Sequence, residues 1–135
     1  MSQPTFFTSI GCMDGRIHNV IEEVGKKKFA ALHADTITEP GFVGLLSREA
    51  MNEVFLKNFK HKLFISTMQH ASKGIIVSAH ADCAGNPVSD SQQKDEVLQS
   101  VDFIKEIVGD FPPVIGVFVK RDPVDPAKWI AEDVS

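Results

Sequence analysis

The sequence predicts an α/β fold, in which residues 1–135 form a single domain with a central, mainly parallel four-stranded β-sheet flanked by helices. Two observations predict it. Short runs rich in β-branched and aromatic residues alternate along the chain with longer segments whose apolar residues recur every three or four positions. This alternation favours parallel strands joined by helices that cover both faces of the sheet. With 135 residues, of which 43% are hydrophobic, the chain is long enough to bury a core without disulfides.

The first third of the chain predicts a strand, a helix and a second strand. Residues 6–11, with the sequence FFTSIG, have the β-branched and aromatic content of a buried strand. Residues 29–37 predict the second strand, which the Pro40-Gly41 pair ends. Residues 17–27 predict a short helix between them, because apolar side chains fall on one face at i, i+3, i+4 and i+7, namely Ile17, Val20, Ile21 and Val24.

The middle of the chain predicts two helical stretches and a third strand. Residues 47–58 predict a helix with Ser47 as its N-cap. Residues 60–71 predict another helical stretch. Residues 75–79 form a short apolar run of the kind that is buried on both faces of a parallel sheet.

The last third predicts a long helix, a strand and a tail. Residues 89–108 carry apolar side chains at helical spacing, and residues 114–119 predict the last strand. We expect the tail from Asp122 onward to pack over the surface through Trp129 and Ile130.

Two short clusters contain both cysteines of the chain, and each follows a predicted strand. The first cluster holds Cys12, Asp14 and Arg16, and the second holds His80 and Cys83. Ligands of parallel α/β sheets bind beyond the carboxyl ends of the strands, so we expect the two clusters to meet there. Zinc takes thiolate and imidazole ligands, and a catalytic zinc site has three protein ligands and an open fourth position. The sequence therefore predicts zinc held by Cys12, His80 and Cys83, with water or the Asp14 carboxylate in the fourth position.

At these residues the chain resembles the β-class carbonic anhydrases, whose motifs are C-x-D-x-R after the first strand and H-x-x-C after a later one. Both motifs are complete, and they stand in the family's order. The resemblance implies that the first and third strands are adjacent at the centre of the sheet. It also implies reversible hydration of carbon dioxide to bicarbonate by a zinc-bound hydroxide.

The same resemblance assigns the catalytic residues and the partners. Asp14 would orient the hydroxide, and the forked guanidinium of Arg16 would orient Asp14. In some members the aspartate instead binds zinc and closes the site. The partners implied are a small substrate, carbon dioxide or bicarbonate, and a second copy of the chain, because in relatives a neighbouring subunit completes the pocket. We therefore expect a homodimer or higher homo-oligomer.

The sequence departs from the family at the loop after the second strand. Thr38 and Glu39 stand where an Arg-Asn pair is usual, and the Glu39 carboxylate would repel bicarbonate, act as an extra base or bind zinc. Phe42 follows this loop, and we favour core packing for it over lining the carbon dioxide pocket. For Asp82 we favour a turn role over contact with a ligand imidazole. Glycine and small residues after Cys83 would let backbone N–H groups approach the thiolates.

Two other functions stay open. With an altered pocket, the same site would act on a related small molecule such as carbonyl sulfide or carbon disulfide. Alternatively, the zinc only stabilises a non-catalytic domain, with Asp14 or Glu39 as a permanent fourth ligand. A redox pair of Cys12 and Cys83 is a weak hypothesis, because the chain lacks C-x-x-C spacing.

Charge and composition exclude several classes of function. The formal net charge of −4 gives no general attraction to nucleic acid, and we expect the Lys26-Lys27-Lys28 run to be a solvated helix end. No apolar run approaches the length of a membrane span. Two cysteines and no hydrophobic leader indicate a cytoplasmic protein. The lack of tyrosine excludes phenolic acid–base catalysis.

Overall fold

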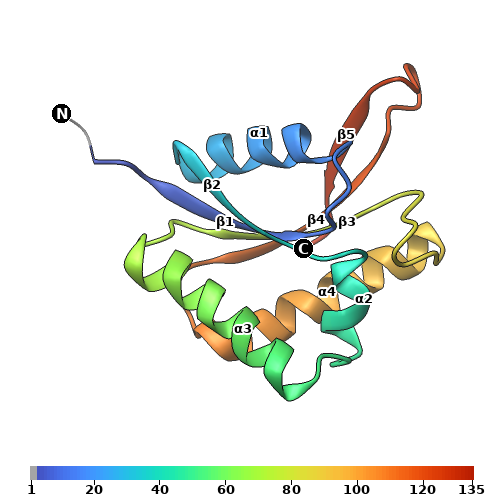
Figure 1. Cartoon of the computed structure of the whole chain (residues 1–135). Coiled ribbons are helices and arrows are strands. Elements are labelled where there is room, and N and C mark those ends of the chain that lie inside the picture. The colour runs from blue at the N-terminus through green and yellow to red at the C-terminus, as the bar shows by residue number, and fades with distance from the viewer. Residues whose placement is uncertain (1–2) are drawn as a thin grey trace.

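The computed structural model describes residues 3–135, which form a five-stranded sheet with helices on both faces (Figure 1). Its strand order is β2-β1-β3-β4-β5. The first four strands along the chain run parallel, and β5 is antiparallel to β4 at one edge. The predicted α/β class and mainly parallel sheet are confirmed, as is the adjacency of the first and third strands. The strands are β1 (Phe6–Gly11), β2 (His33–Thr38), β3 (Ile75–His80), β4 (Val114–Arg121) and β5 (Trp129–Asp133).

The sheet separates the first helix from the other three (Figure 1). Helix α1 covers one face, and α2, α3 and α4 cover the other. No helix within residues 3–135 has both the length and the apolar character needed to cross a bilayer. The helices are α1 (His18–Phe29), α2 (Phe42–Ser47), α3 (Glu53–Phe64) and α4 (Asp90–Val108), and α3 continues into a π-helical turn, η1 (Ile65–Gln69).

The prediction of four strands is wrong in number, because the tail forms a fifth. Residues 129–133 pair with β4, in a register that sets Trp129 opposite Arg121. Pro123 and Pro126 fall in the exposed connection between β4 and β5. β5 is half-buried up to its exposed last residue, Asp133, and it lacks a clean alternation of apolar and polar residues. The strand therefore has no local signal, and its pairing with β4 defines it.

The predicted helix over residues 47–58 is also wrong. Ser47 ends α2 instead of capping a new helix, and the chain turns at Glu49, whose φ of 49° is left-handed. The next helix begins after Asn52, whose side chain accepts a hydrogen bond of 2.9 Å from the Phe55 N–H. The predicted stretch over residues 60–71 is the second half of α3 and η1. Asn52, five residues after the predicted cap Ser47, is the residue that caps the helix, so the helix starts later than predicted.

The second strand begins later than predicted. Phe29 belongs to α1, which ends when Ala30 adopts a left-handed φ of 51° and donates its N–H to the Lys26 carbonyl. The three lysines form the exposed last turn of α1, as expected. An apolar residue such as Phe29 can end a helix or begin a strand, and the sequence does not distinguish the two. The left-handed turn at Ala30 sets the end of α1 and so delays the start of β2.

The core has two layers, one on each face of the sheet. The larger layer packs Phe42, Phe59 and Leu63 from the helices against β1 and β3. The smaller layer lies under α1, where the fully buried Phe7 ring packs directly on Gly25. A Cβ at position 25 would collide with that ring, so glycine permits the close approach of α1 to the sheet.

We expect Gly25→Ala to lower the free energy of unfolding by about 1–2 kcal/mol, because overpacking outweighs the gain in helix propensity. Gly15→Ala is the control, since a Cβ at Gly15 meets no atom within 4 Å. Urea unfolding of both variants measures the difference. Equal stabilities would contradict the packing argument.

Candidate metal centre

The pairing of β1 with β3 brings the two clusters to one edge of the sheet. Both strands are parallel, with Ile10 opposite Val77, so Cys12 and His80 emerge side by side. The chain then turns at Asp82, whose φ of 57° is left-handed, and returns Cys83 toward Cys12. The turn role favoured for Asp82 thus agrees with its backbone. Gly11 is needed at the end of β1, because a Cβ there would collide with the Ser78 hydroxyl.

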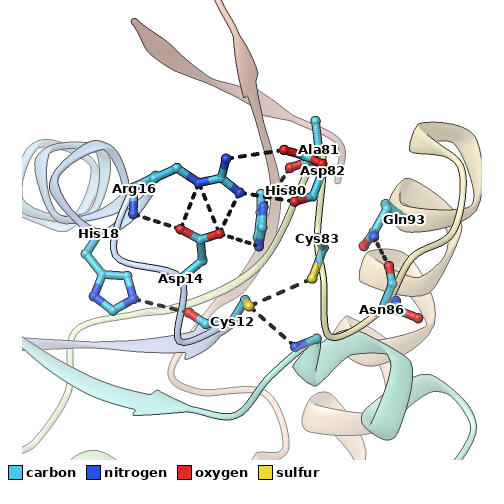
Figure 2. A network of polar contacts seen from close by, with 11 residues as sticks. Cys12, Asp14, Arg16, His18, His80, Ala81, Asp82, Cys83, Asn86 and Gln93 are labelled. Atoms are coloured by element: carbon cyan, nitrogen blue, oxygen red, sulfur yellow. Dashed lines mark hydrogen bonds and ion pairs between the residues drawn. The ribbon is translucent and has the colours of Figure 1, made fainter. Parts of the chain in front are cut away.

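The structure brings Cys12, His80 and Cys83 together as predicted (Figure 2). Their potential ligand atoms all lie within 4.8 Å of one another, and all three residues are buried. His80 Nδ1 lies 2.7 Å from the Ala81 carbonyl, to which it donates its proton. This leaves the Nε2 lone pair free, and Nε2 is a buried polar atom without a hydrogen-bond partner among residues 3–135.

This donor set fits zinc. With zinc–sulfur bonds of about 2.3 Å in a tetrahedron, two thiolates stand about 3.8 Å apart. The Cys12 and Cys83 sulfur atoms are 3.8 Å apart. Ligand imidazoles usually donate their other N–H to a carbonyl, as His80 does to Ala81. Cys12, His80 and Cys83 are the group of histidine, cysteine or acidic side chains among residues 3–135 that could hold a metal ion.

The two thiols differ in acidity. Burial alone would raise the pKa of Cys12, but the adjacent His80 imidazole and the amides of Gly41 and Asp14 outweigh it and lower the pKa to about 7. The Gly41 N–H lies 3.4 Å from the Cys12 sulfur. Burial and the neighbouring Cys12 raise the pKa of Cys83. For His80, burial acts to lower the pKa, but Cys12 and the Ala81 carbonyl raise it overall. Of the two thiols, Cys12 is therefore the one that ionises at the lower pH.

Asp14 and Arg16 form a forked ion pair above these three residues (Figure 2). The Arg16 Nη2 donates to Asp14 Oδ2 at 2.7 Å, Nε donates to both carboxylate oxygens, and the Arg16 backbone N–H donates to Oδ1 at 2.9 Å. These hydrogen bonds lower the pKa of Asp14 to about 2. Arg16 also donates to the backbone carbonyl of Asp82 at 3.1 Å, which ties the two clusters together.

The Asp14 carboxylate lies beside the three-residue group without belonging to it. Its Oδ2 is 3.9 Å from His80 Nε2, while Arg16 holds both oxygens. Asp14 as a fourth metal ligand stays a prediction. The forked contact expected of Arg16 is present.

The loop after Cys83 rests on a buried polar network that the sequence reading missed. Glu96 accepts hydrogen bonds from the Asn86 side chain and from Arg48, both at 2.6 Å. Gln93 donates to the Asn86 carbonyl at 2.7 Å. The network holds the Gly85 and Asn86 amides near the Cys83 sulfur, where they favour its thiolate. A sequence signal existed, because polar residues interrupt the inward stripe of α4 at Gln93, Glu96 and Ser100.

Glu39 and Phe42 lie next to the site but outside it. Both line a cavity of about 120 Å³, which the metal-binding candidates do not line. Phe42 is buried and packs edge-on against Phe59, so the favoured core role is confirmed, although the ring is also a cavity wall. Glu39 is absent from the metal-capable group found among residues 3–135.

His18 also contacts the site, although the sequence gave it no partner. Its Nε2 lies 3.1 Å from the Cys12 carbonyl, and this contact links the first turn of α1 to the backbone of Cys12. No sequence motif marks it, because the contact is to a main-chain atom.

Comparison with known proteins identifies a family by sequence and a shared fold by structure. A family model described as "Putative carbonic anhydrase" matches residues 2–134. A search of curated proteins finds no match. Among solved structures, β-carbonic anhydrase isoform I from the protozoan Trichomonas vaginalis has a TM-score of 0.63 at 14% identity, covering 99% of this chain and 85% of that one.

Two further structures are similar. The carbonic anhydrase from Streptococcus mutans has a TM-score of 0.62 at 15% identity, covering 100% of this chain and 87% of that one. The carbonic anhydrase from Glaciozyma antarctica has a TM-score of 0.58 at 16% identity, covering 99% and 85%. At these identities the likeness shows the shared fold.

We expect Glu96→Ala to lower the free energy of unfolding by about 1–3 kcal/mol, because the buried Asn86 amide loses its acceptor. Metal affinity should fall about tenfold or more, since the loop that supports Cys83 loosens. Urea unfolding and competitive zinc titration measure both effects. Glu106→Ala, an exposed change on the same helix, is the control and should stay within about 0.5 kcal/mol. Equal behaviour of the two variants would disprove a supporting role for Glu96.

The Asp14 carboxyl should titrate near pH 2 in the metal-free protein, below its usual 3.8. Because the folded pKa is the lower one, the ion pair stabilises the fold above about pH 4, and this contribution is lost as the pH falls through about 2. Carboxyl ¹³C NMR measures the titration. Arg16→Gln should return the pKa toward 3.8, whereas Lys105→Gln on α4 should leave it in place. An unshifted Asp14 in the wild type would refute the clamp.

Proposed function

The chain belongs to the carbonic anhydrase family that its sequence matches, and we propose that it binds zinc through Cys12, His80 and Cys83 and interconverts carbon dioxide and bicarbonate. One observation carries the proposal. Two buried sulfur atoms at the separation of zinc thiolates and a free imidazole nitrogen stand beside a carboxylate that an arginine holds in place. We also propose that residues 1–135 act as a single zinc-binding domain.

The chemistry needs a nucleophile that bulk water does not supply at neutral pH. Zinc, when bound, lowers the pKa of a coordinated water toward about 7. Two thiolate ligands weaken that effect, because each donates negative charge. The chain's own residues then have to compensate by orienting the reactants.

Asp14 has the protonation state and the position for orientation. Its low pKa keeps it ionised at every pH of interest, so it only accepts hydrogen bonds. With Oδ2 at 3.9 Å from His80 Nε2, it would accept a hydrogen bond from the O–H of the nucleophile and so direct an oxygen lone pair toward the carbon. Arg16 fixes the carboxylate through both oxygens, and the contact of Arg16 with Asp82 fixes the guanidinium.

The open form of the site favours this function over a purely structural metal. In the non-catalytic alternative, Asp14 or Glu39 would be a permanent fourth ligand. Here Arg16 engages both Asp14 oxygens, and Glu39 faces the neighbouring cavity. These contacts support water, and not a protein carboxylate, as the fourth ligand in the proposed site. Action on carbonyl sulfide or carbon disulfide remains the alternative within the same site.

Assembly and location remain predictions. The outer edge of β2 has no partner strand within residues 3–135, and such an edge suits pairing with a second copy. We keep the homodimer or higher homo-oligomer and the cytoplasmic location as proposals, testable by light scattering and by imaging of the tagged protein.

We expect stoichiometric zinc in the purified protein and carbon dioxide hydration in stopped flow between about pH 6.5 and 9. Cys12→Ala should lose zinc and activity together. Arg16→Ala should keep zinc but lose about 10–100-fold in activity, because Asp14 is no longer oriented. The pH profile should contain no step from Asp14, which stays ionised.

Asp14→Asn tests the carboxylate directly, with the exposed Asp95→Asn as its matched control. Activity should fall in the first variant and persist in the second. Zinc without hydration at any pH in the wild type would reject the proposed reaction, and sulfide release from carbonyl sulfide would then support the alternative substrate.

A further inference from the structure

One aromatic side chain contacts the candidate centre from the far end of the chain. Trp129 is the single tryptophan of the sequence and begins β5. The Arg16 guanidinium lies over its ring, with Cζ 5.0 Å from the centroid. The His80 ring meets it edge-on, with centroids 6.5 Å apart and planes at 76°. In Figure 1 the β4–β5 hairpin rises beside the loop that follows β1.

A second arginine fixes the indole from within the hairpin. Arg121 pairs directly with Trp129 across the two strands, and its Cζ lies 4.5 Å from the ring centroid. Arg121 also donates to the Pro126 carbonyl at 3.0 Å, which braces the connection. β4 itself pairs with β3, setting Val119 opposite His80. The indole is thus placed relative to His80 by two successive strand pairings.

We propose that Trp129 is a positioning residue, which holds the Arg16 guanidinium so that Arg16 can hold Asp14. The Arg16 side chain is 40% exposed, and an exposed ion pair by itself gains little because two side chains must be ordered. The face of a tryptophan ring attracts a guanidinium, and the N–H groups of the guanidinium stay available for a carboxylate. The stacking on Trp129 and the ion pair with Asp14 therefore restrain the Arg16 side chain from different directions.

The inference makes the β4–β5 hairpin part of the site. A segment without any catalytic motif would control the orientation of Asp14 through Arg16. This inference rests on the proposed function for its effect on activity, but the contact itself exists without zinc. Its test therefore includes a measurement on the metal-free protein.

The test compares Trp129→Leu, which keeps apolar bulk but removes the π face, with Trp129→Phe, which retains a smaller face. In wild-type protein labelled with ¹⁵N-arginine, the Arg16 Nε–H resonance should show a ring-current shift and slow solvent exchange. Trp129→Leu should abolish the shift and speed the exchange, and Trp129→Phe should restore part of both. Trp129→Leu should also lower kcat about fivefold with KM unchanged.

Ile130→Ala is the matched control for a merely loosened hairpin. Ile130 lies next to Trp129 on β5 and pairs with Lys120, so its truncation weakens the hairpin without removing the aromatic face. If Trp129→Leu had the Arg16 resonance and the kcat of the wild type, the inference would be overturned. It would also be overturned if Ile130→Ala lost the Arg16 ring-current shift and kcat to the same extent as Trp129→Leu. A wild type that hydrates no carbon dioxide rejects the proposed function alone, because the Arg16 resonance still decides whether Trp129 positions Arg16.

Discussion

The parallel pairing of β1 with β3 is the constraint on which the rest of the site depends. The ends of these neighbouring strands place Cys12 and His80 on the same edge of the sheet. A left-handed turn at Asp82 then suffices to bring Cys83 within 3.8 Å of Cys12. Glycine at the end of β1 permits the close approach, because the neighbouring Ser78 leaves no room for a Cβ. The geometry of the candidate metal centre is thus a consequence of sheet topology.

Three separate devices, each made by hydrogen bonding, hold His80, the loop of Cys83 and Asp14 in place around this centre. The Ala81 carbonyl fixes the His80 tautomer, and the network at Glu96 fixes the loop that carries Cys83. The forked pair with Arg16 keeps Asp14 ionised and holds its carboxylate beside His80 Nε2. The first two devices use hydrogen bonds in a buried or half-buried setting, where they are stronger than in water, whereas the forked pair lies at the surface. A change in one device should therefore leave the others in place.

The sequence reading succeeded where the signal was local. The strands before Cys12 and His80 are rich in β-branched or aromatic residues, helix α4 has clear apolar periodicity, and both motifs lie at strand ends. It failed at residues 47–58, where the cap at Asn52 outweighed Ser47, and at β5, which has no pattern apart from its partner. Glu96 was missed because a charged residue on an inward helix face has meaning only once its partners are known.

The sequence by itself determined the α/β class, the metal-binding candidates Cys12, His80 and Cys83 and the pairing of Asp14 with Arg16, because these depend on residue type and short spacing. The tertiary structure alone decided which carbonyls, amides and rings surround them. Trp129 reaches Arg16 only because β5 folds back on β4, and β4 pairs with β3. Contacts between segments so distant in sequence are set by strand order and register, which no local pattern encodes.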